Sequence, residues 1–242
     1  MNILVIAAHP DDEVLGMGGT IFKYTKLGHK VKVAIMATGI KSRRSTNFKN
    51  NSKYEISETY EKKIQQQILE LRKNSLHASK ILGVTDVEFF DFPDNEMDKI
   101  SNLEITKQIE KVIEEFKPEK IFTHSAYDIN IDHRLLYLAT LTATRPKKNQ
   151  TVKEVYVFEV PSSTEWFFPS KFSPNVFVDI SKELKTKQKA LMAYKNEIEK
   201  FPHPRSVKSL EIIAKRWGTV SGLRSAEAFT LIRQIIKNQN VL

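Results

Sequence analysis

Short apolar runs alternate with longer amphipathic segments along most of the chain. Six runs rich in Ile, Val, Phe and Ala predict buried strands, at residues 3–8, 31–37, 87–92, 120–124, 154–160 and 176–180. Segments with helical periodicity separate the first four of these runs. Strands that alternate with helices in this way predict βαβ units and a mainly parallel sheet.

Helical spacing is clearest in two long segments. Residues 59–82 repeat apolar side chains at steps of three and four, and Gly83 then provides a suitable C-terminal cap. Residues 103–117 follow the same pattern until Pro118 stops the helix. The C-terminal part of the chain is mostly helical by the same criterion, with helices expected at 181–199, 206–217 and 225–237.

A cluster of acidic residues follows the first strand directly. His9 ends the apolar run, and Asp11, Asp12 and Glu13 come next. Open α/β sheets bind ligands just beyond the carboxyl ends of their strands, and one His with several carboxylates suits a divalent metal. Asp11 or Asp12 would also serve simply as the N-cap of the helix that follows. This segment alone leaves both interpretations open.

Polar side chains also crowd the segment after the strand at 120–124. The four polar side chains between Asp128 and His133 are too closely spaced for a core strand. Because this segment again follows a strand end, we expect it to meet the first cluster at one edge of the sheet. His133 would then join His9 and Asp12, and two His with one carboxylate are typical of a hydrolytic zinc site. A solvated turn is the alternative.

Together the two clusters resemble the motifs of one family. Residues 8–13 (Ala-His-Pro-Asp-Asp-Glu), 16–20 (Gly-Met-Gly-Gly-Thr) and 132–134 (Asp-His-Arg) are similar to the zinc-dependent PIG-L/LmbE-like N-acetyl-sugar deacetylases. Further similar segments extend the resemblance over essentially the whole chain, at 82–84, 93–95, Asp98, 159–166, 202–206 and 218–229. The resemblance implies a Rossmann-like three-layer α/β sandwich with extra C-terminal helices, forming a single domain over residues 1–242.

The resemblance also implies a reaction, the hydrolysis of the acetamide of an amino sugar such as N-acetylglucosamine. Acetate and a free amine would be the products. By motif position, His9, Asp12 and His133 would bind Zn²⁺, which lowers the pKa of a bound water to about 7. Asp11 would be the general base for attack by the zinc-bound water.

Five further positions have candidate roles, each with a structural alternative. Asp132 and Glu13 would orient their neighbours through hydrogen bonds, or would only cap helices. Arg72 and Asp94 match positions that hold sugar hydroxyls, although a surface residue and a turn residue would look the same. Trp166 offers an apolar face to a sugar ring, or is a buried core residue.

One position departs from the family pattern. Many relatives have a His three residues before the last metal ligand, where it polarises the substrate carbonyl, and this chain has Asn130 there. Asn donates hydrogen bonds but carries no positive charge, so Asn130, the zinc or another His must stabilise the oxyanion. His124 and His203 are the candidates. His203 lies between two prolines in a loop that also contains Arg205, although a surface turn would account for it as well.

The composition restricts the cellular compartment and the kinds of metal site that we expect. The chain has 242 residues and no Cys, which excludes disulfides and thiolate zinc sites. No window approaches the roughly 20 apolar residues that span a bilayer, and no signal peptide precedes the first strand. We therefore expect a cytoplasmic protein. A homo-oligomer is a separate expectation. Residues 40–55 are polar and basic, which predicts a long loop and a candidate lid.

The net charge of +9 would favour an anionic partner. A substrate that carries phosphate, nucleotide or lipid fits this charge, as does peripheral contact with a membrane, and cell-envelope glycan metabolism is the setting that we expect. Nucleic-acid binding is not expected, because no recognition motif is present. A Lys-rich solvated surface is the simpler explanation.

Two other classes of function fit parts of the sequence. A non-catalytic Rossmann-like nucleotide-binding module would need a Gly-x-Gly-x-x-Gly motif, which residues 16–19 do not supply. A magnesium-dependent phosphotransferase would use the carboxylates after the first strand. Magnesium prefers ligands that are all oxygen, so His9 and His133 argue against this second class.

Overall fold

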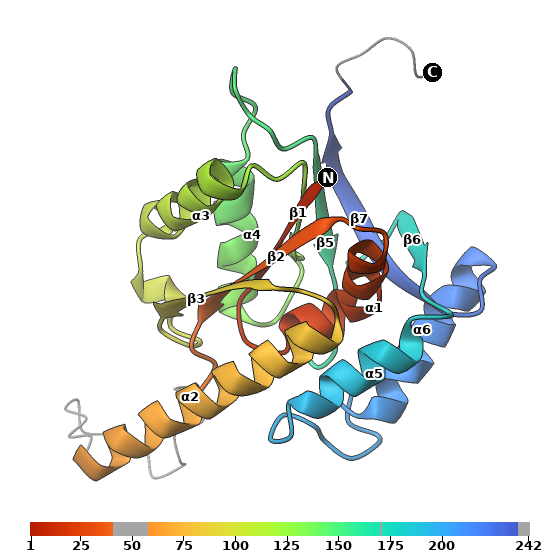
Figure 1. Cartoon of the computed structure of the whole chain (residues 1–242), viewed down its shortest axis with the longest axis horizontal. Coiled ribbons are helices and arrows are strands. Elements are labelled where there is room, and N and C mark those ends of the chain that lie inside the picture. Colours follow the sequence, from red (N-terminus) through yellow and green to blue (C-terminus); the bar gives the residue numbers. More distant parts are fainter. Residues whose placement is uncertain (41–57, 170, 237–242) are drawn as a thin grey trace.

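The computed structural model describes residues 1–40, 58–169 and 171–236. Within these residues one sheet has seven strands in the order β3-β2-β1-β4-β5-β7-β6 (Figure 1). Five neighbouring strands are parallel, namely β1 (Asn2–Ala7), β2 (Lys30–Ala37), β3 (Asp86–Phe92), β4 (Lys120–His124) and β5 (Glu154–Phe158). The last two pairings, of β7 (Ala226–Gln234) with β5 and with β6 (Val176–Asp179), are antiparallel. The expected mainly parallel sheet is confirmed.

Helices cover both faces of the sheet, as Figure 1 shows. One face carries α1 (Asp12–Lys26), α2 (Glu58–Ile81), α5 (Leu184–Ala193) and α6 (Val207–Ser221). The other carries α3 (Asn102–Phe116) and α4 (Ile131–Ala143). Each face has its own apolar core, which confirms the three-layer sandwich. None of the helices in the described residues combines the length and the apolar character that crossing a bilayer demands.

Most predicted elements lie close to the observed ones, and one is wrong. All six predicted strands are present, and the two long helices α2 and α3 begin and end within one residue of their predicted bounds. The helix predicted at 181–199 is shorter, and the one at 206–217 continues to Ser221. The loop predicted at 40–55 lies, beyond Ile40, outside the described residues.

Residues 225–237 were predicted to be helical, and this prediction is wrong. Ala226–Gln234 form strand β7, in which Phe229 aligns with Phe158 of β5 on one side and with Val176 of β6 on the other. The segment contains aromatic and β-branched residues that favour strands. Pairing on both sides satisfies its backbone and buries residues 226–229, so tertiary pairing outweighs the local helical spacing.

The order of the strands reverses between β1 and β4. These two parallel strands lie side by side with Val5 aligned to Phe122, while β2 and β5 continue the sheet on either side. Ligands bind at such a switch point in open α/β sheets, beyond the carboxyl ends of the strands. The segments that follow Ala7 and His124 therefore leave the sheet at the position expected for a site.

Helix α1 is broken at Met17, whose φ of −147° is not helical. A buried ion pair fills the break, with Lys187 Nζ 2.6 Å from Glu227 Oε1. Lys187 Nζ also donates to the carbonyl of Leu15 at 2.8 Å, and the Glu227 carboxylate accepts from the next two freed amides, those of Gly19 and Thr20. The ion pair thus satisfies the backbone groups that the break exposes.

The glycines around this break permit close packing. A Cβ at Gly16 would lie 2.4 Å from the ring of Phe158, and one at Gly19 would lie 2.8 Å from Ile180. The glycine-rich segment is therefore explained by the approach of α1 to the sheet, without any need for a bound pyrophosphate.

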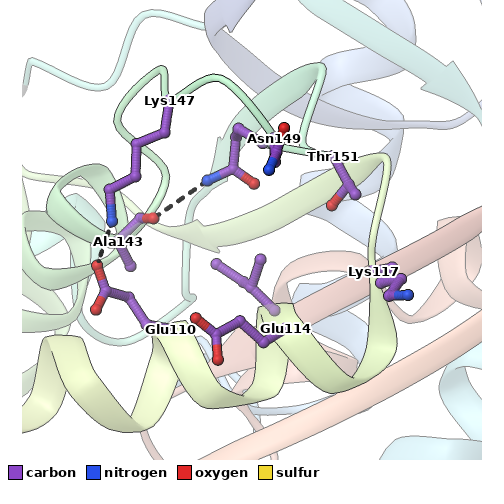
Figure 2. A pocket seen from close by; sticks show the side chains of 9 residues that line it. Glu110, Glu114, Lys117, Ala143, Lys147, Asn149 and Thr151 are labelled. Carbon is purple, nitrogen blue, oxygen red and sulfur yellow. Dashed lines mark hydrogen bonds and ion pairs between the residues drawn. The ribbon is translucent and has the colours of Figure 1, made fainter.

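A pocket of about 280 Å³ opens at the C-terminal ends of α3 and α4 (Figure 2). Lys117 and Thr151, which line it, precede β4 and β5, so it lies at the edge of the sheet opposite to the strand ends discussed above. Glu110, also in its lining, accepts from Lys107 and from Lys147, and these hydrogen bonds lower its pKa to about 2. None of the residues proposed from the sequence lines this pocket.

Candidate metal centre and active site

The three predicted metal ligands meet beyond the switch point. His9 follows β1, Asp12 begins α1 and His133 lies in the first turn of α4. All three are buried, and one potential ligand atom from each lies within 4.8 Å of the other two. Asp12 Oδ2 is 3.3 Å from His9 Nδ1 and 3.2 Å from His133 Nε2.

The other nitrogen of each imidazole faces a buried carboxylate. His9 Nε2 lies 3.0 Å from Asp132 Oδ2 and 3.1 Å from Asp94 Oδ1. His133 Nδ1 lies 3.0 Å from Asp128 Oδ2. A carboxylate that accepts the outer N–H of a His fixes the ring and its tautomer. His9 Nδ1 and His133 Nε2 are consequently the nitrogens directed at Asp12.

These outer carboxylates are themselves held in place. Asp132 accepts from the amides of Asn95, at 2.7 Å, and Met97, at 3.1 Å. Asp128 accepts from the hydroxyls of Ser163 and Thr164 in the loop after β5. Burial acts to raise the pKa of Asp128, but the facing His133 and these hydroxyls outweigh it and lower the pKa to about 2.

Sequence reasoning did not single out Asp128 and placed Asp94 among the sugar-binding residues. Asp128 belongs to the polar segment noted after β4, yet the two hydroxyls that it accepts from lie more than 30 residues later in the chain. Asp94 contacts His9 in the cluster. Both Asp94 and Asp132 place a carboxylate oxygen beside His9 Nε2.

The charges of the cluster suit a cation. Burial alone would raise the pKa of Asp12, but His133 and His9 hold it well below its ordinary value. Burial opposes protonation of His133, and Asp12 and Asp128 nevertheless raise its pKa to about 9. Among the described residues, the buried Asp12 Oδ1 has no hydrogen-bond partner. Two imidazoles and a carboxylate with an unsatisfied buried oxygen therefore fit a divalent metal, which would displace protons on binding.

Asp11 lies beside this cluster in an unusual backbone conformation. Its φ is 107°, a left-handed value that costs a non-glycine residue roughly 1–3 kcal/mol and is found mostly at functional sites. Its amide donates to Glu13 Oε2 at 3.1 Å, and Glu13 in turn accepts from the hydroxyl of Tyr194. Burial raises the pKa of Glu13 to about 7, against the effect of the Tyr194 hydroxyl. Glu13 thus contacts the amide of the neighbour that it is predicted to orient, and this role stays a prediction.

The carboxylate of Asp11 faces Arg205. Within the described residues neither buried oxygen accepts a hydrogen bond, while Arg205 Nη1 lies 3.2 Å from Oδ2. Burial raises the pKa of Asp11 well above its ordinary value, and Arg205 opposes this shift. Arg205 is fixed by Ser162, whose hydroxyl accepts from Nε at 2.8 Å, and by Glu197 at 3.4 Å. Sequence reasoning noted Arg205 only as a neighbour of His203.

The candidates for oxyanion stabilisation occupy different places. Asn130 is the N-cap of α4, accepts from the amide of Asp132 and donates from Nδ2 to Asn95 Oδ1 at 2.9 Å. His124 is fully buried, and its Nε2 accepts from the amide of Ala8 at 2.8 Å. Burial lowers the pKa of His124 well below its ordinary value, so it is neutral.

His203 and Trp166 lie together at the rim. Their ring centroids are 6.1 Å apart in an edge-to-face arrangement, and both line a pocket that Arg205 also lines. Trp166 is 43% exposed, which excludes the alternative of a core residue. Arg72 lies elsewhere: its Nη2 donates to the carbonyl of Phe90 and to Asp91 Oδ1 at 2.6 Å, at the end of β3.

Replacing Asn130 by Ala tests its two roles separately. We expect the loss of the helix cap to lower the free energy of unfolding by about 0.5–2 kcal/mol, as urea denaturation would show. If Asn130 also acts on the substrate, turnover falls while the metal content stays unchanged. Ser101→Ala is the matched control, because Ser101 caps α3 by accepting from the amide of Leu103. If Asn130→Ala had the same turnover as Ser101→Ala, Asn130 would act only as the cap of α4.

The fold and the cluster agree with a comparison against known families. Residues 4–144, more than half of the chain, match the PIG-L family, described as GlcNAc-PI de-N-acetylase. The chain belongs to the PIG-L family. The expected enzyme class, an N-deacetylase that hydrolyses an amide, is confirmed by this membership and by the names of related proteins.

Curated relatives of this PIG-L family chain include two deacetylases of N-acetylated sugars. The diacetylchitobiose deacetylase of Thermococcus kodakarensis is 28% identical, over 96% of this chain and 83% of the relative. A probable N-acetyl-α-D-glucosaminyl L-malate deacetylase 2 of Bacillus cereus is 26% identical, over 82% and 84% respectively. Among solved structures, the N,N'-diacetylchitobiose deacetylase of Pyrococcus horikoshii superposes with a TM-score of 0.73 at 21% identity, covering 96% of this chain and 84% of that one. At this identity the superposition shows a shared fold.

Proposed function

We propose that this chain is a Zn²⁺-dependent hydrolase that removes the acetyl group from N-acetylglucosamine or a compound that contains it. The observation that carries the proposal is the position of Asp11, a buried carboxylate directly beside the cluster of His9, Asp12 and His133. The names of both curated relatives refer to N-acetylglucosamine units, which supports this substrate class.

The donor set supports zinc over magnesium. His9 Nδ1, the Asp12 carboxylate and His133 Nε2 would hold the ion, and magnesium rarely takes two imidazoles. Zn²⁺ at such a site polarises a carbonyl and lowers the pKa of a coordinated water to about 7. Asp132 and Asp128 keep the two imidazoles in position for this role.

Asp11 supplies the proton transfers in this proposal. Its carboxylate takes the proton of the water whose oxygen bonds to the acetyl carbon, and returns it to the amide nitrogen as the C–N bond breaks. The products are acetate and the free amine. A base raised in pKa by burial is better matched to neutral pH, and Arg205 keeps its carboxylate oriented.

Stabilisation of the oxyanion and binding of the sugar are assigned to residues that the sequence singled out. Asn130 and His203 remain the proposed polarising residues, although Asn130 Nδ2 would have to exchange its present partner Asn95 for the substrate. Trp166 is proposed to stack on the sugar. Arg72 and Asp94 are proposed to bind hydroxyls, and the contact of Asp94 with His9 supports an orienting role as well.

The remaining expectations form part of the same proposal. We place the enzyme in the cytoplasm, as a homo-oligomer with one domain over residues 1–242, acting in cell-envelope glycan or related metabolism. The match to the PIG-L family and the histidines of the cluster count against the nucleotide-binding module and the magnesium phosphotransferase.

The decisive experiment measures amine and acetate released from N-acetylglucosamine and its nucleotide- and lipid-linked forms. With Zn²⁺ present we expect equal amounts of both products. Chelation should abolish their release, and added Zn²⁺ should restore it. Release of inorganic phosphate in place of acetate would support the phosphotransferase, and nucleotide binding by a metal-free, inactive protein would support the module.

Asp128 provides a test of the metal centre that needs no substrate. Asp128→Asn is expected to weaken Zn²⁺ binding by roughly 10–100-fold, because His133 Nδ1 loses its negatively charged acceptor. His133→Ala should reduce zinc occupancy further. A competition titration with a chelator gives the affinities. Asp86→Asn, at the start of β3, is the matched control and should bind zinc like the parent; an Asp128→Asn protein that does the same would refute the role of Asp128.

A further inference from the structure

The net charge of the protein is concentrated between β6 and β7. Residues 180–225 contain eleven Lys and Arg against four Asp and Glu, which gives +7 of the +9 of the whole chain. All the other residues together therefore carry only +2. A surface that is Lys-rich throughout would spread its charge along the chain, so the concentration is a property of this segment.

Burial separates the charges of this segment further. Glu183 and Glu197 are buried, and Lys187 is buried in its ion pair with Glu227. The structure describes all of residues 180–225, and nine basic side chains are exposed there, whereas Glu199 is the one exposed acidic side chain. The surface of the segment is thus more basic than its composition.

Helices α5 and α6 carry many of these cations on their outer sides. Lys185, Lys189 and Met192 are exposed at steps of four and three along α5. The two helices lie side by side (Figure 1), and Gln188 Nε2 of α5 donates to the carbonyl of Val207 at the start of α6 at 3.5 Å. The exposed residues of α6 also recur at helical spacing and are Lys208, Ile212, Lys215, Arg216, Thr219 and Val220. We name the exposed residues of the two helices the basic face.

The cations of the basic face differ from those of the opposite layer. On α3, Lys107 lies 2.7 Å from Glu110 and Lys111 lies 4.0 Å from Glu115, so exposed lysines have acidic neighbours there. On the basic face, Lys215 is the one cation that forms an ion pair with a residue that the structure describes. Like charges on adjoining helices repel one another, and an anionic partner would relieve this repulsion.

Apolar side chains among the cations favour a bilayer over other polyanions. Met192 and Ile212 are each 48% exposed, and Val220 is 61% exposed. Phe201, which precedes α6, is 50% exposed, and the centre of its ring lies 4.4 Å from Lys208 Nζ. Cations attract anionic headgroups, and apolar side chains beside them enter the boundary between headgroups and acyl chains. The phosphate backbone of a nucleic-acid duplex offers no apolar surface to such side chains.

We propose that the basic face of α5 and α6 binds the surface of a bilayer that contains anionic phospholipids. The attachment is peripheral and reversible, because it depends on charge and on a few apolar side chains at the interface. No substrate or metal takes part in it, so the proposal is independent of the deacetylase function.

Cosedimentation of the whole protein with vesicles tests the proposal. Vesicles of phosphatidylglycerol and phosphatidylcholine in equal parts should bind the protein, and vesicles of phosphatidylcholine alone should bind it at least about tenfold more weakly. Binding to the anionic vesicles should weaken as the salt concentration rises, because salt screens the attraction. Equal binding to both kinds of vesicle would overturn the proposal.

Two double variants link the binding to the basic face. Lys185→Gln with Lys189→Gln should weaken binding to the anionic vesicles about 25-fold, at about fivefold for each charge near the surface. Lys107→Gln with Lys111→Gln is the matched control, because it removes the same charge from exposed positions of α3 on the other face of the sheet. The control should bind within about twofold of the parent, since salt screens distant charges. Equal affinities of the two double variants would overturn the proposal.

Ile212→Gln distinguishes a bilayer from another anionic partner. It should weaken vesicle binding about fivefold, because about half of this apolar side chain is exposed and would leave water at the interface. A DNA duplex at the same salt concentration is the competing ligand, and the parent should bind it more weakly than the vesicles. Tighter binding of the duplex, or vesicle binding by Ile212→Gln equal to that of the parent, would show that the bilayer is the wrong partner.

Discussion

Asp11→Asn is expected to lower kcat by about 10²–10⁴-fold, the range for loss of a general base, while the protein still binds its metal. The amide of Asn has nearly the same shape but cannot accept a proton at neutral pH. Asp11 is not one of the three residues whose ligand atoms converge, so metal content should be unchanged. Acetate release and metal analysis on the same preparation give both quantities.

His9→Ala is the comparison for this variant. It removes a converging ligand atom, so activity and metal should be lost together. The assignment of Asp11 as the base would be wrong if Asp11→Asn lost as much metal as His9→Ala, or if it kept more than a tenth of the parent's kcat. Circular dichroism would establish that both variants are folded.

Lys187→Met is expected to lower the free energy of unfolding by about 3–5 kcal/mol, the cost of leaving a buried charge without its partner. Lys187 and Glu227 have side chains that are 4% and 3% exposed and lie 2.6 Å apart. Without the ammonium group, the Glu227 carboxylate would remain buried and the carbonyl of Leu15 would lose its donor. Urea denaturation of the parent and the variant measures the difference.

A double variant and a surface variant complete this test. Lys187→Met with Glu227→Gln should recover part of the loss, because the glutamine removes the uncompensated charge and still accepts from an amide of α1. Lys107→Met breaks an exposed pair with Glu110 and should cost no more than about 1 kcal/mol. If Lys187→Met cost no more than Lys107→Met, the buried pair would not stabilise the break in α1.

The sequence predicted the parts of the fold that depend on local pattern. Strands β1, β2, β4 and β5 are mostly buried on both faces and therefore appear as apolar runs, which is why they could be recognised. The edge strand β3 is mostly half-buried, and its Val and Phe residues made it recognisable. Strand β7 could not be recognised, because its place between β5 and β6 depends on pairing with residues more than 40 positions away. Locally its apolar residues also fit a helical spacing.

The same distinction separates the predicted and the missed parts of the site. His9 and Asp12 follow β1, and His133 lies in the helix that follows β4. Because β1 and β4 lie side by side, motif and topology together place these residues at one edge of the sheet. Arg205 acquires its role from a contact with Asp11 that no spacing in the sequence indicates. Asp128 lies close to His133 in the chain, but its carboxylate is held toward the imidazole by hydroxyls of the distant residues Ser163 and Thr164. Many aspartates lie in turns, and only the folded chain shows which of them reach an imidazole.

The capping of α1 by Glu227 has a consequence for how the protein is made. A ribosome synthesises Gly19 and Thr20 early, but the carboxylate that satisfies their amides lies more than 200 residues later in the chain. In the nascent chain, the amides of Gly19 and Thr20 therefore lack their acceptor Glu227 until β7 has left the exit tunnel. Contacts of such long range slow folding, so we expect the final cooperative step to follow the synthesis of β7.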